Sequence, residues 1–289
     1  MPIEDIFSEH RYIPLETRDD LLLPDISEIR RVTLSDDGQH IFISDRNSVM
    51  RFHLDGRFDR RYRHQGEGPE DYFGIWSFTL WKNGDISIFD MYHKAILTYS
   101  EEDSFISRFR YPEWDMFNMI SLDDSLLLIR CTDLKKDDYL FHVINRNTGM
   151  EESAYWKLEK PDKVFAYMLD YGEKILLNRY KSNDIHELTR DSAILRYRIN
   201  IDNKIPPEGY WRQENKDIFE TYRLIDDYIG HIPFFMESDR SIFLQYDGGA
   251  KERQGFAFVD KATRESRAIN RFIFEDGFVY RPEYLYPLS

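Results

Sequence analysis

The chain has 289 residues, of which 42% are hydrophobic and 16% aromatic, and its formal net charge is −14. This hydrophobic content supports a large folded core and excludes a disordered chain, and the length suits an all-β barrel or propeller. Because an acidic surface repels phosphate backbones and anionic headgroups, the charge disfavours nucleic acids and membrane surfaces as partners.

The cysteine content and the hydropathy pattern limit the classes further. Cys131 is the only cysteine, which excludes an internal disulfide and a cysteine-based zinc site, and we expect it to be a buried small residue. No run of about 18 apolar residues is present, so we expect no transmembrane helix. Residues 1–16 lack a basic n-region and an apolar h-region, so we expect no signal peptide in the chain as given; a leader removed from a mature domain is the alternative.

Short apolar strands in pairs dominate the chain. Many turn through hairpin signals, such as Asn83-Gly84 and the Asp55-Gly56 step, where a positive φ is favoured. The first strands of the pairs are predicted at 40–45, 85–90, 125–130, 174–180 and 241–247, and their partners at 48–54, 95–100, 139–145, 193–200 and 255–261.

These pairs repeat with a period that identifies the fold. Units of four strands that recur every 40–50 residues are typical of propeller blades, which bury both faces of each sheet against their neighbours. We therefore predict one all-β domain over 1–289, a six-bladed β-propeller of four-stranded antiparallel blades. A long insert at 203–230 is expected to hold a loop and a short helix near 215–226. The five complete blades are predicted at 25–66, 73–110, 117–158, 164–212 and 232–271, with a closing sixth blade from 272–289 plus 10–16. This last blade is either closed by the N-terminal strand or incomplete.

The glycine-rich stretch "HQGEGPEDYFG" (64–74) raises the question of phosphate binding. A phosphate loop needs a helix N-terminus after it, whereas an alternating aromatic strand follows here, and three acidic residues within the loop would repel a phosphate. We interpret the stretch as a structural loop between two blades. Gly66 and Gly68 are expected to supply unusual φ angles, Pro69 to stiffen the return, and Tyr72 to fill the gap between the blades.

Three stretches resemble a known family. "YIPLETRDD" (12–20), residues 41–72 and "ISIFDMYHKAILTYSEEDSFI" (86–106) are similar to six-bladed β-propellers of Bacteroides-type bacteria, related to NHL-repeat propellers. Glu70 departs from the pattern, which favours glycine there. The resemblance implies the propeller fold and a cell-envelope location, periplasmic or as an outer-membrane lipoprotein. It implies almost no chemistry, because most members have no assigned activity.

One face of the predicted propeller collects the candidate ligand-binding residues. The loops between second and third strands, and those between blades, share this face at the mouth of the central channel. Arginines recur there at similar blade positions, and guanidinium groups suit a carboxylate or sugar-acid ligand; solvated loops or inter-blade salt bridges are the alternative. The candidates are Arg46, Tyr92, His93, Arg130, Arg179, Tyr246 and Arg253.

The sequence contains no local metal-binding or catalytic motif. The eight histidines form no i, i+4 pair and no His-x-His; by loop position, His93 and His186 are the candidates for a metal site built across blades. "CTDLKKDD" (131–138) lacks the ligand order of an EF-hand. We expect no cofactor, with calcium or another divalent ion left open.

These observations predict a non-enzymatic binding or scaffold propeller of the bacterial envelope. Its expected partner is a glycan, a peptide or a protein, bound at the channel-mouth face by aromatic and arginine side chains. The alternative is a metal-dependent lyase or hydrolase on an NHL-like propeller. The sequence indicates neither the ligand nor the oligomeric state.

Overall fold

The structure is a computed structural model in which the chain forms two compact units, centred on residues 12–163 and 164–287. The predicted helix near 215–226 lies outside the described residues. In the described part of the chain, no helix is long and apolar enough to span a membrane. The described residues are 11–19, 21–23, 25–112, 114–133, 139–157, 166–171, 174–179, 182–189, 192–200, 231–247, 255–269, 272–273 and 279–280.

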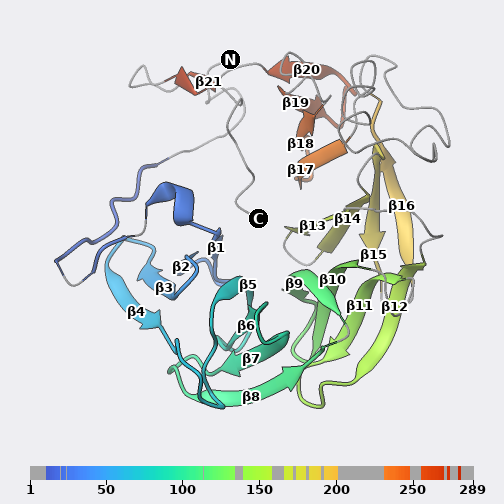
Figure 1. Cartoon of the computed structure of the whole chain (residues 1–289). Helices are drawn as coiled ribbons and strands as arrows, with labels where there is room; N and C mark the ends of the chain where they lie inside the picture. The colour runs from blue at the N-terminus through green and yellow to red at the C-terminus, as the bar shows by residue number, and fades with distance from the viewer. Residues whose placement is uncertain are drawn as a thin grey trace, which may run out of the picture. The chain divides into compact units, whose positions relative to one another are not determined.

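The first unit contains three four-stranded antiparallel sheets, each a meander in which consecutive strands pair (Figure 1). A short 3₁₀ helix, η2 (Ile26–Glu28), precedes the first sheet. The strands are β1 (Arg31–Leu34), β2 (His40–Ser44), β3 (Val49–His53) and β4 (Phe58–Tyr62); β5 (Ile75–Leu80), β6 (Ile86–Asp90), β7 (Ala95–Tyr99) and β8 (Phe105–Arg110); β9 (Asp115–Ser121), β10 (Leu126–Asp133), β11 (Tyr139–Asn145) and β12 (Glu151–Lys157).

The second unit contains two further meanders and one two-stranded sheet. Its strands are β13 (Ala166–Tyr171), β14 (Lys174–Arg179), β15 (Asp184–Leu188) and β16 (Ala193–Arg198); β17 (His231–Glu237), β18 (Ser241–Asp247), β19 (Gly255–Asp260) and β20 (Ser266–Ile269); β21 (Phe272–Ile273) and β22 (Val279–Tyr280).

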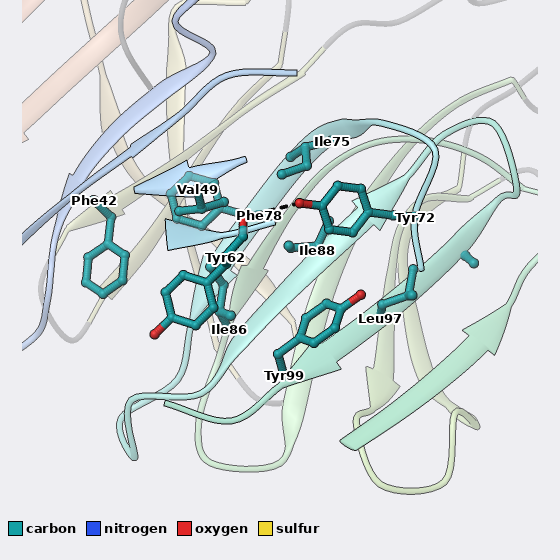
Figure 2. Close-up of a cluster of buried hydrophobic side chains, with 11 residues drawn as sticks. Phe42, Val49, Tyr62, Tyr72, Ile75, Phe78, Ile86, Ile88, Leu97 and Tyr99 are labelled. Atoms are coloured by element: carbon teal, nitrogen blue, oxygen red, sulfur yellow. Dashed lines mark hydrogen bonds between the residues drawn. The ribbon is translucent and has the colours of Figure 1, made fainter. Parts of the chain in front are cut away.

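The middle strands of the first two sheets are buried on both faces, as packed propeller blades require. Every residue of β6 and β7 is buried, whereas β8 is half-exposed. The core between the first two sheets combines Phe42, Val49 and Tyr62 with Ile88 and Leu97, among other side chains (Figure 2). The apolar strand pattern read from the sequence therefore reports burial between successive sheets.

Cys131 lies at the junction of the second and third sheets. It is 2% exposed and packs in a cluster with Phe89, Ile96 and Ile129. The expectation of a buried small residue is confirmed.

The prediction of six blades is wrong, because the chain forms five four-stranded sheets. At the C-terminal end, β21 and β22 pair only with each other among the described residues. Tyr12–Glu16 forms no strand. The backbone N–H of Glu16 instead donates to the oxygen of Gly56 at 2.8 Å, and its carboxylate accepts from the N–H of Phe58 at 2.9 Å. The β3–β4 hairpin thus takes the hydrogen bonds that closure of a sixth blade would need.

Gly56 is essential to this arrangement. It has a φ of +90°, and a Cβ placed there would lie 2.0 Å from the backbone oxygen of Pro14. Only glycine fits a backbone that is both left-handed and so closely approached. The hairpin predicted from the Asp55-Gly56 step is confirmed, with the N-terminal segment packed against it.

The strand assignment in the fourth sheet needs correction. The sequence predicts that the strand at 193–200 pairs directly with the strand at 174–180. In the structure, β15 lies between these two strands and pairs with both. Residues 193–198 are the fourth strand, β16. The stretch that forms β15, "DIHEL", is short and rich in polar residues, and only Ile185 is fully buried.

Candidate binding site

The loop between β4 and β5 is held at several points by hydrogen bonds. Tyr72 is fully buried, and its hydroxyl lies between the carbonyl oxygens of Asn47, at 2.9 Å, and Tyr62, at 3.2 Å (Figure 2). Burial raises the pKa of Tyr72 well above its usual value, so the hydroxyl stays protonated and donates. Tyr72 therefore fills the gap between the first two sheets and fastens the loop to the β2–β3 turn and to the end of β4.

The predicted reason for the two glycines in this loop is wrong. Neither Gly66 nor Gly68 has a φ between +20° and +160°. They are required by space, because a Cβ on either would lie 2.4 or 2.7 Å from Oδ2 of Asp71. That oxygen accepts the N–H of Gly68 at 2.9 Å. The loop thus already holds a carboxylate of its own where a phosphate would bind, and the strand β5 follows it rather than a helix.

Arg108 of β8 holds the outer side of the same loop. Its Nη1 lies 3.2 Å from the carbonyl oxygens of Gly68 and Pro69, and 3.3 Å from that of Asp71. These contacts fix the loop to β8, the last strand of the second sheet.

Two aspartates end the second strands of the first two sheets and organise the turns that follow. Oδ1 of Asp45 accepts the N–H groups of Asn47 and Ser48, both at 2.6 Å. Asp90 is fully buried, and its Oδ1 accepts the N–H of Tyr92 at 3.0 Å. Such Asx turns explain why aspartate follows each strand.

Asp90 also reaches the loop that precedes its sheet. Its Oδ2 accepts the N–H of Phe73 at 2.9 Å and lies 2.6 Å from Nδ1 of His93. One buried carboxylate therefore fixes residues 73 and 92–93 relative to each other. Burying a carboxylate is costly unless it is fully hydrogen-bonded, and these bonds satisfy it.

A hollow of about 60 Å³ opens beside these turns. Sites for drug-sized ligands measure roughly 300–1,000 Å³, so this hollow receives one chemical group and no whole metabolite. It is formed by the start of β5, the residue before β1 and the turns after β2 and β6. Its lining consists of Arg30, Arg46, Gly74, Ile75, Trp76, Met91 and Tyr92.

Arg46 and Tyr92 form one wall of the hollow. The guanidinium carbon lies 5.2 Å from the centroid of the Tyr92 ring, and Nη2 donates to the Tyr92 hydroxyl. The backbone oxygen of Arg46 accepts the N–H of Ile75 at 2.7 Å, which ties the first sheet to the second. A Cβ at Gly74 would lie 3.2 Å from the Tyr92 ring, so the absent side chain keeps the hollow open.

Arg30 and Trp76 form the second arginine–aromatic pair. The guanidinium carbon of Arg30 lies 5.4 Å from the Trp76 ring centroid. On the rim, Phe73 and Tyr92 are 45% and 50% exposed, and their rings meet edge to face at 5.0 Å. We call Arg30, Arg46, Phe73, Trp76 and Tyr92 the aromatic–arginine surface.

The structure brings together three of the predicted ligand-binding residues, Arg46, Tyr92 and His93. Arg130 lies within β10 and is 4% exposed, away from any loop tip. Tyr246 belongs to β18 of the second unit, where it is half-buried and its hydroxyl passes over Gly255. Arg253 and the side chain of Arg179 lie outside the described residues.

The sequence analysis missed Arg30, Trp76 and Phe73. Arg30 directly precedes the strand β1. The sequence-based candidates were taken from loops that follow strands, so Arg30 was not among them. Trp76 and Phe73 belong to an alternating aromatic stretch, which predicts a strand and by itself indicates no binding site. Phe73 and Trp76 lie in or directly after the 64–74 loop. This position in the sequence could have identified both residues, because the hydrogen bonds of the loop fix where their rings lie.

No three His, Cys, Asp or Glu side chains of the described residues gather as metal ligands do. Of the metal candidates, His93 is paired with Asp90, and His186 lies in β15 of the second unit. Residues 134–138 of the stretch considered for calcium lie outside the described residues.

Residues 1–287 match a domain of unknown function, DUF4934. The chain belongs to this family. No curated protein matches it, so the DUF4934 assignment brings no activity with it.

Solved structures similar to this DUF4934 chain confirm the propeller fold. A "Putative exported protein" from Bacteroides fragilis has a TM-score of 0.66 at 19% identity, covering 90% of this chain and 75% of that one. A member of the duf4221 family from Bacteroides vulgatus has a TM-score of 0.56 at 11% identity, covering 93% and 89%. A streptogramin B lyase has a TM-score of 0.50 at 14% identity, covering 89% and 77%. At these identities the likeness shows the fold alone, and the predicted propeller fold is confirmed apart from the blade number.

Proposed function

We propose that this chain is a non-enzymatic binding module of the bacterial cell envelope. Its partner is a glycan, a peptide or a protein, and the aromatic–arginine surface is the binding site. The observation that carries the proposal is the pairing of exposed rings with arginines around a shallow hollow. Exposed aromatic and arginine side chains are the residue types enriched where proteins bind partners.

The surface is preorganised, which supports a binding role. Asp90 holds the backbone of Phe73 and Tyr92, and the Ile75–Arg46 hydrogen bond joins the two sheets beneath the hollow. A ligand therefore meets side chains whose loops are already ordered, and less entropy is lost on binding.

The envelope location is supported by the similar Bacteroides fragilis protein, whose printed name calls it exported. A metal-dependent lyase or hydrolase was the alternative from the sequence. The similar streptogramin B lyase shows a shared fold only, and no cluster of metal-ligating side chains among the described residues favours that reading. We therefore argue the binding function alone.

The test is a binding screen of the purified chain on glycan and peptide arrays, with Tyr92→Ala as the site variant. Tyr12→Ala is the matched control, because Tyr12 is 65% exposed and does not line the hollow. We expect Tyr92→Ala to lose every signal that the wild type and Tyr12→Ala give. Signals that survive Tyr92→Ala and Arg46→Ala alike would place the binding site elsewhere and overturn the proposal.

A further inference from the structure

Two arginines of the aromatic–arginine surface carry charge that the fold does not neutralise. Arg30 and Arg46 are exposed, line the same hollow, and form no ion pair with any described carboxylate. Arg51, Arg57 and Arg146 of the same unit are each paired with an acid. Arg63 and Arg110 are exposed and form no ion pair with a described carboxylate either, but the lining of the hollow contains only Arg30 and Arg46 among the described arginines. In a chain with 53 acidic and 39 basic residues, two adjacent unpaired guanidinium groups indicate a site for an external anion.

The geometry of these groups suits a carboxylate. Arg46 uses one N–H on the Tyr92 hydroxyl, and a guanidinium has five N–H donors in a planar fork that matches a carboxylate. The guanidinium carbons lie 5.2 Å from the Tyr92 ring centroid and 5.4 Å from the Trp76 ring centroid, which places both groups beside the hollow. The volume of about 60 Å³ suits one such group.

The backbone around the hollow is already used, which disfavours an extended peptide. The N–H of Ile75 donates to Arg46, and the N–H groups of Phe73 and Tyr92 donate to Asp90. A peptide that adds as a strand needs free backbone groups at a sheet edge. Recognition at this place therefore comes from side chains.

The exposed rings complete the ligand class. Phe73 and Tyr92 present nearly half of their surface beside the hollow, with ring planes 65° apart. The face of an aromatic ring is electron-rich, so it attracts the weakly positive C–H groups on the face of a pyranose. The aromatic rings suit the face of a sugar ring, and the neighbouring guanidinium groups suit a carboxylate on that sugar.

We propose that the aromatic–arginine surface binds a carboxylate-bearing sugar, a uronic or sialic acid. Its carboxylate enters the hollow between Arg30 and Arg46, and its pyranose ring lies against Phe73 and Tyr92. This inference rests on the proposed function and names the ligand class of the same site.

The test uses calorimetric titration of the full chain with oligogalacturonate, oligomannuronate and sialyllactose, each against its carboxyl-reduced neutral counterpart. We expect at least one acidic sugar to bind, its neutral counterpart to bind about tenfold or more weakly, and salt to weaken the acidic one. Arg30→Ala and Arg46→Ala should each weaken the acidic sugar by about tenfold or more and leave the neutral sugar unchanged. Arg57→Ala, an exposed arginine already paired with Asp55, is the matched control and should change neither.

A conservative variant separates charge from geometry. Arg46→Lys keeps the positive charge and loses the planar fork, so most of the loss should remain. Circular dichroism melts of all variants verify that they fold.

Different outcomes overturn different claims. If acidic and neutral sugars bind equally and only Tyr92→Ala abolishes binding, the carboxylate inference falls and the proposed function stands. If an Asp- and Glu-rich peptide binds through Arg30 and Arg46 while no sugar does, the ligand class is wrong. If neither sugars nor peptides bind in a way that depends on this surface, the inference and the proposed function both fall.

Discussion

Glu237 offers a quantitative test of the packing between the fourth and fifth sheets. It ends β17, its side chain is 8% exposed, and its carboxylate accepts Nε and Nη2 of Arg196, both at 2.9 Å. It also accepts the hydroxyl of Tyr197 at 2.6 Å and an N–H of Lys261. Burial alone would raise the pKa of Glu237, but hydrogen bonds from Arg196, Lys261 and Tyr197 outweigh it and lower the pKa from 4.5 to about 2.

The pKa shift sets both the size and the sign of the effect. A fall from 4.5 to about 2 is about 2.5 pKa units, which corresponds to about 3 kcal/mol of unfolding free energy. Because the folded-state pKa is depressed, this stability is fully present above about pH 4.5 and is lost as the pH falls towards 2. Glu237→Gln should therefore cost about 2–3 kcal/mol at pH 7, and its difference from the wild type should shrink below pH 4.5.

Urea titrations of both proteins at pH 7, 5, 4 and 3, followed by circular dichroism, measure this difference. Hydrogen exchange of peptides from β16 and β17 assigns the loss to the second unit. The matched control is Asp55→Asn, whose carboxylate is also paired with an arginine, Arg57, but is exposed; it should leave the unfolding free energy unchanged. A difference for Glu237→Gln that stays constant from pH 7 to 3 would refute the reasoning.

Two further predictions concern the first unit. Tyr72→Phe keeps the buried ring but leaves the carbonyl oxygen of Asn47 without its 2.9 Å donor, so urea titration should show a loss of about 1–3 kcal/mol; an unchanged midpoint would mean that the hydroxyl does not anchor the loop. Gly149→Ala and Gly38→Ala meet the same left-handed backbone, with φ of +69° and +66°, but a Cβ at Gly149 would lie 2.3 Å from the Phe109 ring and one at Gly38 meets nothing within 4 Å. Both should lose about 1 kcal/mol from the backbone, and Gly149→Ala about 1–3 kcal/mol more from overpacking; equal thermal shifts would contradict the packing term.

The sheets could be predicted because their burial is written into local sequence. β6 is buried at every position, and "ISIF" is an apolar run bounded by polar turns. β15 was missed for the opposite reason, since its partly exposed residues are polar and give no periodic signal. Local pattern thus indicates a strand where apolar residues form a run, as in β6, and gives no signal where they do not, as in β15.

The blade number could not be predicted from local pattern. The N-terminal segment contains apolar residues suited to a strand, but its hydrogen bonds go to the β3–β4 hairpin through Glu16. That outcome depends on Gly56 leaving room for Pro14, a contact over about forty residues of chain. Counting repeats therefore predicts the five four-stranded blades, but it does not predict which strands the two ends of the chain pair with.

The candidate site shows the same division between local and distant causes. Arg46 and Tyr92 were found because each lies in the loop after a second strand, which is a local signal. Arg30 was not found, because it comes beside this loop only through the pairing of β1 with β2, where its N–H donates to the oxygen of Ser44 at 2.8 Å. Of the two arginines that line the hollow, only Arg46 could be predicted from the sequence, and Arg30 is identified only in the folded chain.

The difference between two equivalent aspartates explains why the hollow lies beside the second sheet. Asp45 uses Oδ1 to close its own turn. Asp90 closes its turn in the same way, but its Oδ2 also binds the N–H of Phe73 and the ring of His93. That second oxygen fixes an exposed ring next to the turn that holds Tyr92. A turn of the kind that also closes on Asp45 thereby supports the aromatic–arginine surface, through the added hydrogen bonds of Asp90 to Phe73 and His93.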